Sequence, residues 1–266
     1  MKPLAALLLA ATAAWADTPA DLRALVRKSL AGIQREEERR SQFLFKVRSE
    51  RKELDSDGKV ASRNSSVWER IEIDGYTFGR TLERNGKPLT TEERRSEDEA
   101  IQKRLTELKA SKLPQQEPPT RSQQQDWYKE FPEALDYKLA GEETFNGRAT
   151  LRLDATPRPG YEPKNLRARV FEKLKATLWI DKASSELVKV DGEMFDTVNV
   201  GFGVVGRVEK GTRFRLQRRQ VSDGVWLIDS QTVRFAARFM LFKSIRSEAT
   251  TEWSEFRRRT VILARR

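Results

Sequence analysis

The sequence predicts an α+β fold, in which a curled antiparallel sheet of about ten strands forms an unclosed β-barrel that amphipathic helices cover. Three observations predict it. Apolar and polar residues alternate along many short segments, which is typical of strands with one dry face. Asn-Gly, Asp-Gly and similar turn signals join most of these segments by connections too short for parallel pairing. Two further segments carry apolar residues at helical spacing. A twisted sheet of this size must curl, so its apolar face encloses a volume.

The N-terminus carries the pattern of a secretory signal peptide. Lys2 is a short positive region, residues 4–14 are apolar, and Ala14-Trp15-Ala16 is a cleavage site of the A-x-A type. The apolar run is too short to span a hydrocarbon core of ~30 Å. We therefore expect a signal peptide at 1–16, cleavage between Ala16 and Asp17, and a periplasmic protein. The alternative is a buried N-terminal helix.

The mature chain is expected to begin with a helix that runs from residue 18 towards residue 41. Thr18 is the N-cap, Pro19 takes the first helical position, and Asp21 lies in the first turn. The stripe that follows must face something apolar, and it consists of Leu22, Leu25, Val26, Leu30 and Ile33. From Phe43 the period changes to two, which predicts a strand.

Turn signals at 55–58, Asp74-Gly75 and Asn85-Gly86 delimit an antiparallel meander with strands at 59–73 and 76–84. Thr90 and Glu93 form a capping box that opens a polar helix ending near residue 112. Residues 114–125 (PQQEPPTRSQQQ) are a linker without periodicity. We predict a single domain over 17–266, with the charged helix and linker as an insertion at about 90–125, because neither half has enough strands to enclose a core.

The second half repeats the antiparallel pattern. Turn signals occur at Asn146-Gly147, at 181–185 and at Asp223-Gly224. The strands expected there are 137–145, 147–156, 175–180, 187–195, 212–222, 225–237 and about 243–256.

Composition excludes most familiar catalytic chemistry. The chain has no cysteine and no histidine, which removes disulfides, thiol nucleophiles, Ser-His-Asp triads and Cys- or His-ligated zinc. Carboxylate pairs such as Asp154 with Asp181, or Glu193 with Asp196, identify no active site because 40 acidic residues make accidental proximity common. We expect no enzyme activity, no cofactor and no metal.

The segment Gly201–Val208 matches the G-x-G-x-x-G dinucleotide pattern. A nucleotide-binding loop of this type is followed directly by a helix, whereas the alternation at Phe214 and Leu216 predicts another strand. We interpret the segment as a glycine-rich flap at the mouth of a cavity. The residues expected to form the flap are Phe202, Val204 and Val205.

The chain is basic, with 51 Lys and Arg against 40 Asp and Glu and a formal net charge of +11. Basic runs at 167–169, 213–219 and 257–259 are interpreted as solvated strand faces, with attraction to anionic lipid headgroups as a further interpretation. No motif of a nucleic-acid-binding fold occurs, so we expect no nucleic acid as a partner.

Three strings of the second half resemble a known superfamily: Tyr137–Leu153, Pro157–Pro163 and Leu178–Met194. They are similar to secreted bacterial proteins related to the lipoprotein-sorting chaperone LolA and the sigma-factor regulator RseB, in which W-I-D ends a strand at a tight turn. The segments Asp55–Lys59 and Asn85–Thr90 add to the likeness. The resemblance implies an unclosed barrel whose concave apolar face, under helices, holds acyl chains. It implies no particular ligand residue.

These observations predict a soluble periplasmic carrier or chaperone that binds lipid or the acyl chains of a lipoprotein. Burying about fourteen CH2 groups releases about 11 kcal/mol, and association costs ~4–15 kcal/mol, so one chain is held reversibly. The alternative is a periplasmic sensor or scaffold of the same fold that binds a protein partner and carries no ligand. An anionic membrane surface or a periplasmic protein is the further partner to consider. The residues expected to line the cavity are Phe43, Phe45, Val47, Ile71, Ile73, Leu151, Leu153, Leu178, Ile180, Phe214, Leu216, Trp226, Ile228 and Phe235.

Overall fold

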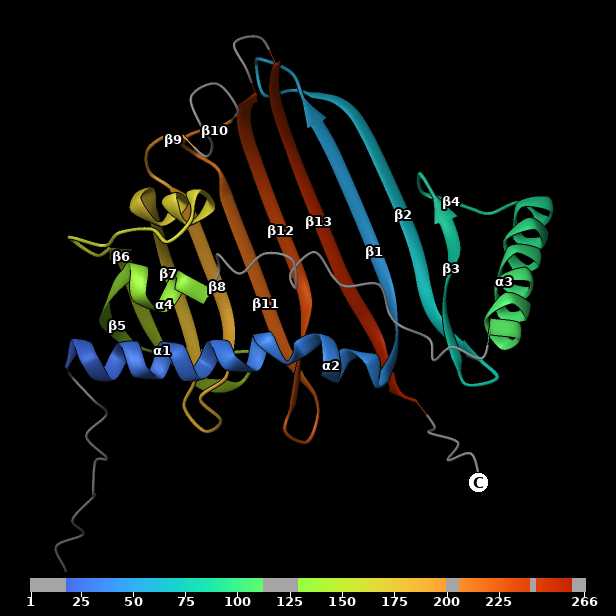
Figure 1. Cartoon of the computed structure of the whole chain (residues 1–266), viewed down its shortest axis with the longest axis horizontal. Helices are drawn as coiled ribbons and strands as arrows, with labels where there is room; N and C mark the ends of the chain where they lie inside the picture. The colour runs from blue at the N-terminus through green and yellow to red at the C-terminus, as the bar shows by residue number, and fades with distance from the viewer. Residues whose placement is uncertain (1–17, 112–128, 200–205, 240–242, 260–266) are drawn as a thin grey trace, which may run out of the picture.

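The computed structural model describes residues 18–111, 129–199, 206–239 and 243–259 (Figure 1). Thirteen strands form one sheet. The strands of the first half are β1 (Phe43–Leu54), β2 (Val60–Ile73), β3 (Tyr76–Arg84) and β4 (Lys87–Pro88). Those of the second half are β5 (Leu135–Phe145), β6 (Arg148–Pro157), β7 (Leu174–Asp181), β8 (Leu187–Met194), β9 (Val198–Asn199), β10 (Arg207–Val208), β11 (Arg213–Ser222), β12 (Val225–Phe239) and β13 (Lys243–Arg258).

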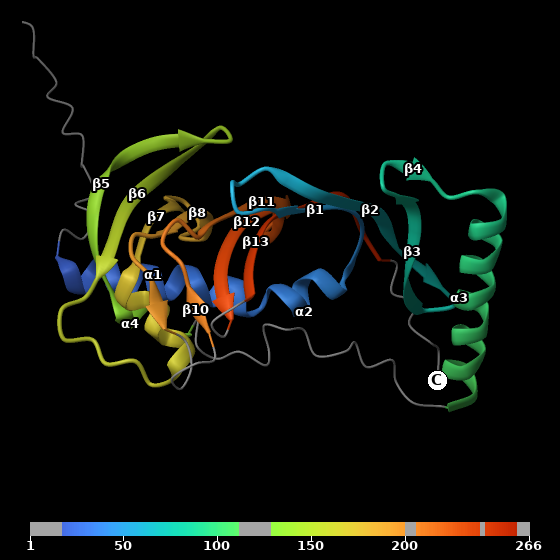
Figure 2. The ribbon, with the colours of Figure 1, turned by 90° about the horizontal axis from the view of Figure 1, so that it is seen from above.

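The sheet is antiparallel and open. Its order is β4-β3-β2-β1-β13-β12-β11-β8-β7-β6-β5, with β10 pairing beside β12 and β9 beside β10. Within the described residues β4 and β5, the two ends of this order, do not pair with each other, so the barrel is not closed (Figure 2). The predicted curled, unclosed antiparallel sheet is confirmed. Three strands have only two residues each, which leaves ten long strands where about ten were predicted.

The strands reverse at the predicted turns. Asp74 and Gly75 have φ angles of 53° and 82°, and Asn146 and Gly147 have φ angles of 49° and 75°. A two-residue hairpin whose twist matches its strands needs positive φ at both positions, which Asn or Asp followed by Gly adopts at low cost. Local chemistry therefore determines where these hairpins turn.

Helices cover one side of the sheet, which we call the inner face. They are α1 (Pro19–Gln34), α2 (Glu36–Ser41), the short α4 (Phe131–Ala134) and the 3-10 helix η2 (Leu166–Lys173). The first two run across the strands (Figures 1 and 2). The expected cap of α1 is present, because the Asp21 backbone N–H donates to Thr18 Oγ1 at 3.3 Å.

The polar helix α3 (Thr91–Ser111) packs beside β3 at the end of the sheet (Figure 1). Its capping box is formed: the Glu93 N–H donates to Thr90 Oγ1 at 3.2 Å, and the Thr90 N–H donates to Glu93 Oε2 at 2.8 Å. In the described part of the chain, no helix combines the length and apolar character needed to cross a membrane.

The main core lies between α1 and the inner face of β5 to β8. Val26 and Leu22 of α1 are buried there against Leu135, Leu153 and Leu178. The rest of the predicted stripe of α1 packs against the same cluster. Helix α1 is thus held on the sheet by the apolar stripe that the sequence predicts.

Three smaller clusters surround this core. Phe78 packs against Ile101 and Leu105 of α3. Phe43, Phe45, Val47 and Leu227 form a second cluster around the start of β1. Trp179, Val188 and Trp226 form a third on the opposite side of the sheet, the outer face, because Trp179 alternates with the core residues Leu178 and Ile180.

Asp181, which ends β7, is a buried carboxylate in a tight turn. Arg148 Nε and Nη2 donate to it at 2.6 and 3.0 Å, and the Ser184 backbone N–H and hydroxyl donate at 2.8 and 2.7 Å. Burial acts to raise the pKa of Asp181, but the hydrogen bonds from Arg148 and Ser184 outweigh it and hold that pKa below its ordinary value.

We expect Asp181→Asn to make stability less sensitive to acid. A carboxylate with a lowered folded-state pKa stabilises the protein above its unfolded pKa of about 3.9, and this contribution is lost as the pH falls through the folded value. Urea unfolding at a series of pH values from neutral to strongly acidic measures it. A variant whose stability falls with acid as steeply as that of the unmodified protein would contradict the expectation.

Arg218 on β11 corrects the interpretation of residues 213–219 as a solvated face. Its side chain is fully buried. Arg218 Nη1 donates to Glu186 at 2.9 Å and to the Leu187 carbonyl at 3.0 Å, Nη2 donates to the Trp226 carbonyl at 3.0 Å, and Nε lies 3.3 Å from Glu36 of α2. A bulge between Gln217 and Arg218 breaks the alternation of the strand at this point.

Candidate functional site

An apolar cavity of about 420 Å³ lies on the inner face, between α1, η2 and the strands β7, β8, β11 and β12. Helix α1 contributes Leu30 and Ile33, and the sheet contributes residues from five strands, β10 included. The full lining is Leu30, Ile33, Phe131, Val170, Phe171, Leu174, Leu178, Leu187, Val190, Met194, Val208, Thr212, Phe214 and Phe235. Leu30 and Ile33, which belong to the apolar stripe that packs α1 on the core, therefore also form the helical side of this cavity.

The lining offers one polar side chain, the hydroxyl of Thr212. That hydroxyl donates to the Ala236 carbonyl at 3.1 Å and accepts from the Ala236 N–H at 3.2 Å. Both hydrogen bonds of the Thr212 hydroxyl are with the backbone of β12, so this group stabilises the fold and is not available to a ligand. A molecule in this cavity is therefore held by apolar contact and shape.

Phe214 forms part of the wall because its partner on β8 is a glycine. Phe214 and Gly192 are directly paired in the sheet. A Cβ atom built on Gly192 would lie 2.2 Å from Phe214 Cε1 and 2.3 Å from its Cζ. The Phe214 ring thus occupies the space that a side chain at position 192 would fill. Because Gly192 has no side chain, the ring can lie there, beside the cavity.

The structure places three of the fourteen cavity candidates in this lining: Leu178, Phe214 and Phe235. Leu153, Ile180 and Leu216 belong to the adjoining solid core or pack against it, and Leu151 is buried. The remaining candidates are elsewhere: Phe43, Phe45 and Val47 around the start of β1, Ile71 and Ile73 against the α3 cluster, Trp226 on the outer face, and Ile228 beside α2, where its N–H donates to Glu36 at 2.6 Å.

The flap residues Phe202, Val204 and Val205 lie outside the described residues, as do Ala16 and Asp17. The segments on either side of the flap are described. Val198 pairs with Val208, and Asn199 pairs with Arg207, so β9 and β10 form an antiparallel stem. Val208 lines the cavity. Gly206 is followed by this strand, which agrees with the rejection of a nucleotide-binding loop.

Sequence reasoning missed the wall formed by η2, which contributes Val170 and Phe171. The signal that precedes η2 is Asn165, whose Oδ1 accepts the N–H groups of Arg167 and Ala168, both at 3.0 Å. Asn before a short run with apolar residues is an N-cap pattern, and it would have indicated this helical turn.

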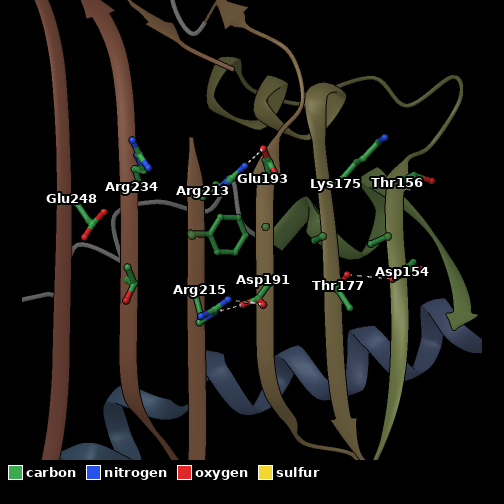
Figure 3. Close-up of a pocket in the computed structure, with 15 residues that line it drawn as sticks. Asp154, Thr156, Lys175, Thr177, Asp191, Glu193, Arg213, Arg215, Arg234 and Glu248 are labelled. Carbon is green, nitrogen blue, oxygen red and sulfur yellow. Dashed lines mark hydrogen bonds and ion pairs between the residues drawn. The ribbon is translucent and has the colours of Figure 1, made fainter. Parts of the chain in front are cut away.

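A larger hollow of about 720 Å³ lies over the polar side of the same strands (Figure 3). Its side chains form ion pairs and hydrogen bonds across neighbouring strands. Arg215 Nε and Nη2 donate to Asp191 at 2.7 and 3.2 Å, Arg213 donates to Glu193 at 2.9 Å, and Thr177 donates to Asp154 at 3.2 Å. These charges largely compensate one another, and we assign no ligand to this groove. Among the described residues, no group of three or more acidic side chains is placed to hold a metal ion.

Comparison with known proteins identifies similar structures only. No protein-family model matches the sequence, and no curated protein matches it. A DUF1329 family protein from Desulfovibrio piger is 14% identical, with 93% of this chain and 95% of that chain covered and a TM-score of 0.34. An outer membrane lipoprotein-sorting protein domain from Vibrio parahaemolyticus is 13% identical, with 89% and 94% covered and a TM-score of 0.32. A LolA superfamily protein from Nitrosomonas europaea is 10% identical, with 88% and 94% covered and a TM-score of 0.30.

The structures to which this chain is similar are thus DUF1329 and LolA superfamily proteins. The identities and scores are low. The function is accordingly derived from the cavity and its lining.

Proposed function

We propose that the protein is a carrier that binds an acyl chain of a lipid or lipoprotein in the inner cavity. The observation that supports this is the hollow itself, about 420 Å³ bounded by apolar side chains. Small-molecule sites typically measure ~300–1,000 Å³. Protein interiors otherwise pack to the density of organic crystals, and an unfilled apolar cavity lowers stability. A hollow of this size is therefore better explained by an occupant than by loose packing.

The lining favours a flexible hydrocarbon as the occupant. Thr212 has its hydroxyl engaged with backbone, so no side chain of the described lining is available to orient a polar group. Each CH2 moved out of water contributes about 0.8 kcal/mol, which suits recognition by length and flexibility alone. Met194 adds a side chain that adapts to irregular apolar surfaces. The signal peptide expected at 1–16 supports action in the periplasm.

The direct test is binding of N-phenyl-1-naphthylamine, a probe that fluoresces in apolar sites, with myristate as competitor. We expect the probe to bind and myristate to displace it. Phe235→Asp places a carboxylate at the wall of the cavity and removes an aromatic contact, so we expect binding at least about tenfold weaker, equivalent to ~1.4 kcal/mol.

Val225→Asp is the matched control. Val225 also lies on β12 and is also partly exposed, but it packs against the cluster around the start of β1 and does not line the cavity. Its affinity for the probe should stay within about twofold of the unmodified protein. Equal weakening by both substitutions, or an unmodified protein that binds neither probe nor myristate, would reject the carrier and favour a sensor or scaffold that binds a protein.

A further inference from the structure

The cluster around the start of β1 is covered by arginine side chains. Its buried members are Phe43, Phe45, Val47 and Leu227, and partly exposed aromatic rings of Trp68, Trp253 and Phe256 pack against them. Four guanidinium groups lie over these rings: Arg40 at 5.2 Å from the centroid of Trp253, Arg70 at 5.8 Å from Phe45, Arg219 at 5.2 Å from Phe256, and Arg258 at 5.9 Å from Phe43. We call this the arginine-capped cluster.

Neighbouring strands bring further positive charge to its edge. Phe43 pairs with Arg258 and Leu44 pairs with Arg257, so the end of β13 lies beside the beginning of β1. Both arginines are exposed, and among the described residues neither forms an ion pair. Arg258 shares the face of Phe43, and Arg257 points to the opposite face at the same edge. The position is the lower edge of the sheet in Figure 1, where α2 leads into β1 and β13 ends.

Three acidic side chains of this region are paired with basic ones. Glu36 accepts from Arg40, Asp229 lies 3.8 Å from Arg219, and Glu255 accepts from Lys46 at 2.7 Å. The surface therefore presents two exposed arginines for which the described residues give no ion pair, Arg257 and Arg258, next to partly exposed tryptophan and phenylalanine.

We propose that the arginine-capped cluster docks the protein on a membrane surface rich in anionic phospholipid. Guanidinium groups match the oxygens of phosphate, and tryptophan favours the headgroup level, where its ring is half in water. The formal net charge of +11 attracts an extended anionic surface as a whole, which a small acidic peptide does not offer. Docking goes beyond the proposed carriage of an acyl chain, because it depends on different residues and does not need the cavity to be occupied.

The geometry connects the two regions. Arg219 and Leu227 of the cluster lie on β11 and β12, the strands that carry Phe214 and Phe235 to the cavity. A membrane bound at the cluster thus contacts the same pair of strands that forms a wall of the cavity.

Sedimentation with phosphatidylcholine vesicles, with and without phosphatidylglycerol, tests the proposal. We expect binding only to the vesicles that contain phosphatidylglycerol, with an affinity that falls as salt is added. The double variant Arg257→Glu and Arg258→Glu should bind these vesicles about thirtyfold more weakly. Both side chains are exposed, so the variant should unfold at the same urea concentration as the unmodified protein.

The control is Arg94→Glu with Arg95→Glu on the exposed face of α3, which changes the net charge by the same amount. It should keep most of the vesicle binding. Equal binding to both vesicle types, or equal weakening by both double variants, would overturn the proposal; the first outcome would leave the cluster as a surface for a protein partner. Binding of N-phenyl-1-naphthylamine, measured on the same variants, should be unchanged, so failure of docking and failure of the carrier function are separable.

Discussion

Arg218→Ala is expected to lower the free energy of unfolding by about 3–5 kcal/mol, the largest effect of any single substitution proposed for this protein. The substitution leaves the buried Glu36 carboxylate without a cation that lies 3.3 Å away, and it deprives Glu186 of a 2.9 Å hydrogen bond. The carbonyl oxygens of Leu187 and Trp226 also lose donors in a place that water does not reach. Urea denaturation measures the loss.

Arg215→Ala is the matched control for this result. Arg215 lies on the same strand and is also paired with a carboxylate, that of Asp191, but its side chain is 54% exposed. Exposed pairs contribute about 0–1 kcal/mol, so the control should change stability little. Similar losses for the two variants would show that Arg218 has no special role in holding α2 to the sheet. A double-mutant cycle with Glu36→Gln should reveal coupling between residues 36 and 218.

Gly192→Ala is expected to weaken binding of an apolar probe at least about tenfold, at a cost to stability of only about 1–3 kcal/mol. The new Cβ atom would stand 2.2 Å from the Phe214 ring, which must therefore move. Free volume is available to the ring in the cavity that it already lines. The displaced ring then fills the space of the ligand. Probe titration and urea denaturation of the same sample measure the two effects.

A second substitution can reverse this one. In Gly192→Ala combined with Phe214→Leu, the ring that would be displaced is no longer present, so probe binding should return towards that of Phe214→Leu alone. Gly79→Ala is the control for a glycine in a strand, because the added atom there would lie 3.6 Å from the Trp68 ring, an ordinary contact. Full binding by Gly192→Ala, or no recovery in the double variant, would contradict the explanation.

Local patterns were sufficient to predict the long strands of this fold and the helices α1 and α3. Strand alternation correctly separated dry from wet positions on β6 and β7, where Leu153 and Leu178 have no exposed surface while Asp154 and Thr177 face the outer groove. The capping box at Thr90 and the Asn-Gly turns also formed as expected. These signals depend on residues that are neighbours in the sequence, so contacts with distant parts of the chain do not change them.

The position of the cavity could not be predicted in the same way. Alternation shows that Leu153 and Leu178 share a face, but only Leu178 borders the hollow, because helix placement decides which inward side chains are covered by others. Trp226 shows a second limit. It lies nine residues from Phe235 on β12, so strict alternation places the two side chains on opposite faces. The Trp226 ring lies on the outer face with Trp179, and aromatic character alone did not identify an inward side chain.

The position of β13 between β12 and β1 has a consequence for biosynthesis. Backbone pairing between the first four strands and all the others runs through this strand, which is the last one formed along the described chain. Before β13 has been synthesised, β1 to β4 and the strands from β5 to β12 form two separate parts of the sheet, with no strand to pair them. Contacts between such distant parts of a chain form slowly. The order of its strands thus leaves the sheet incomplete until the last strand has been made.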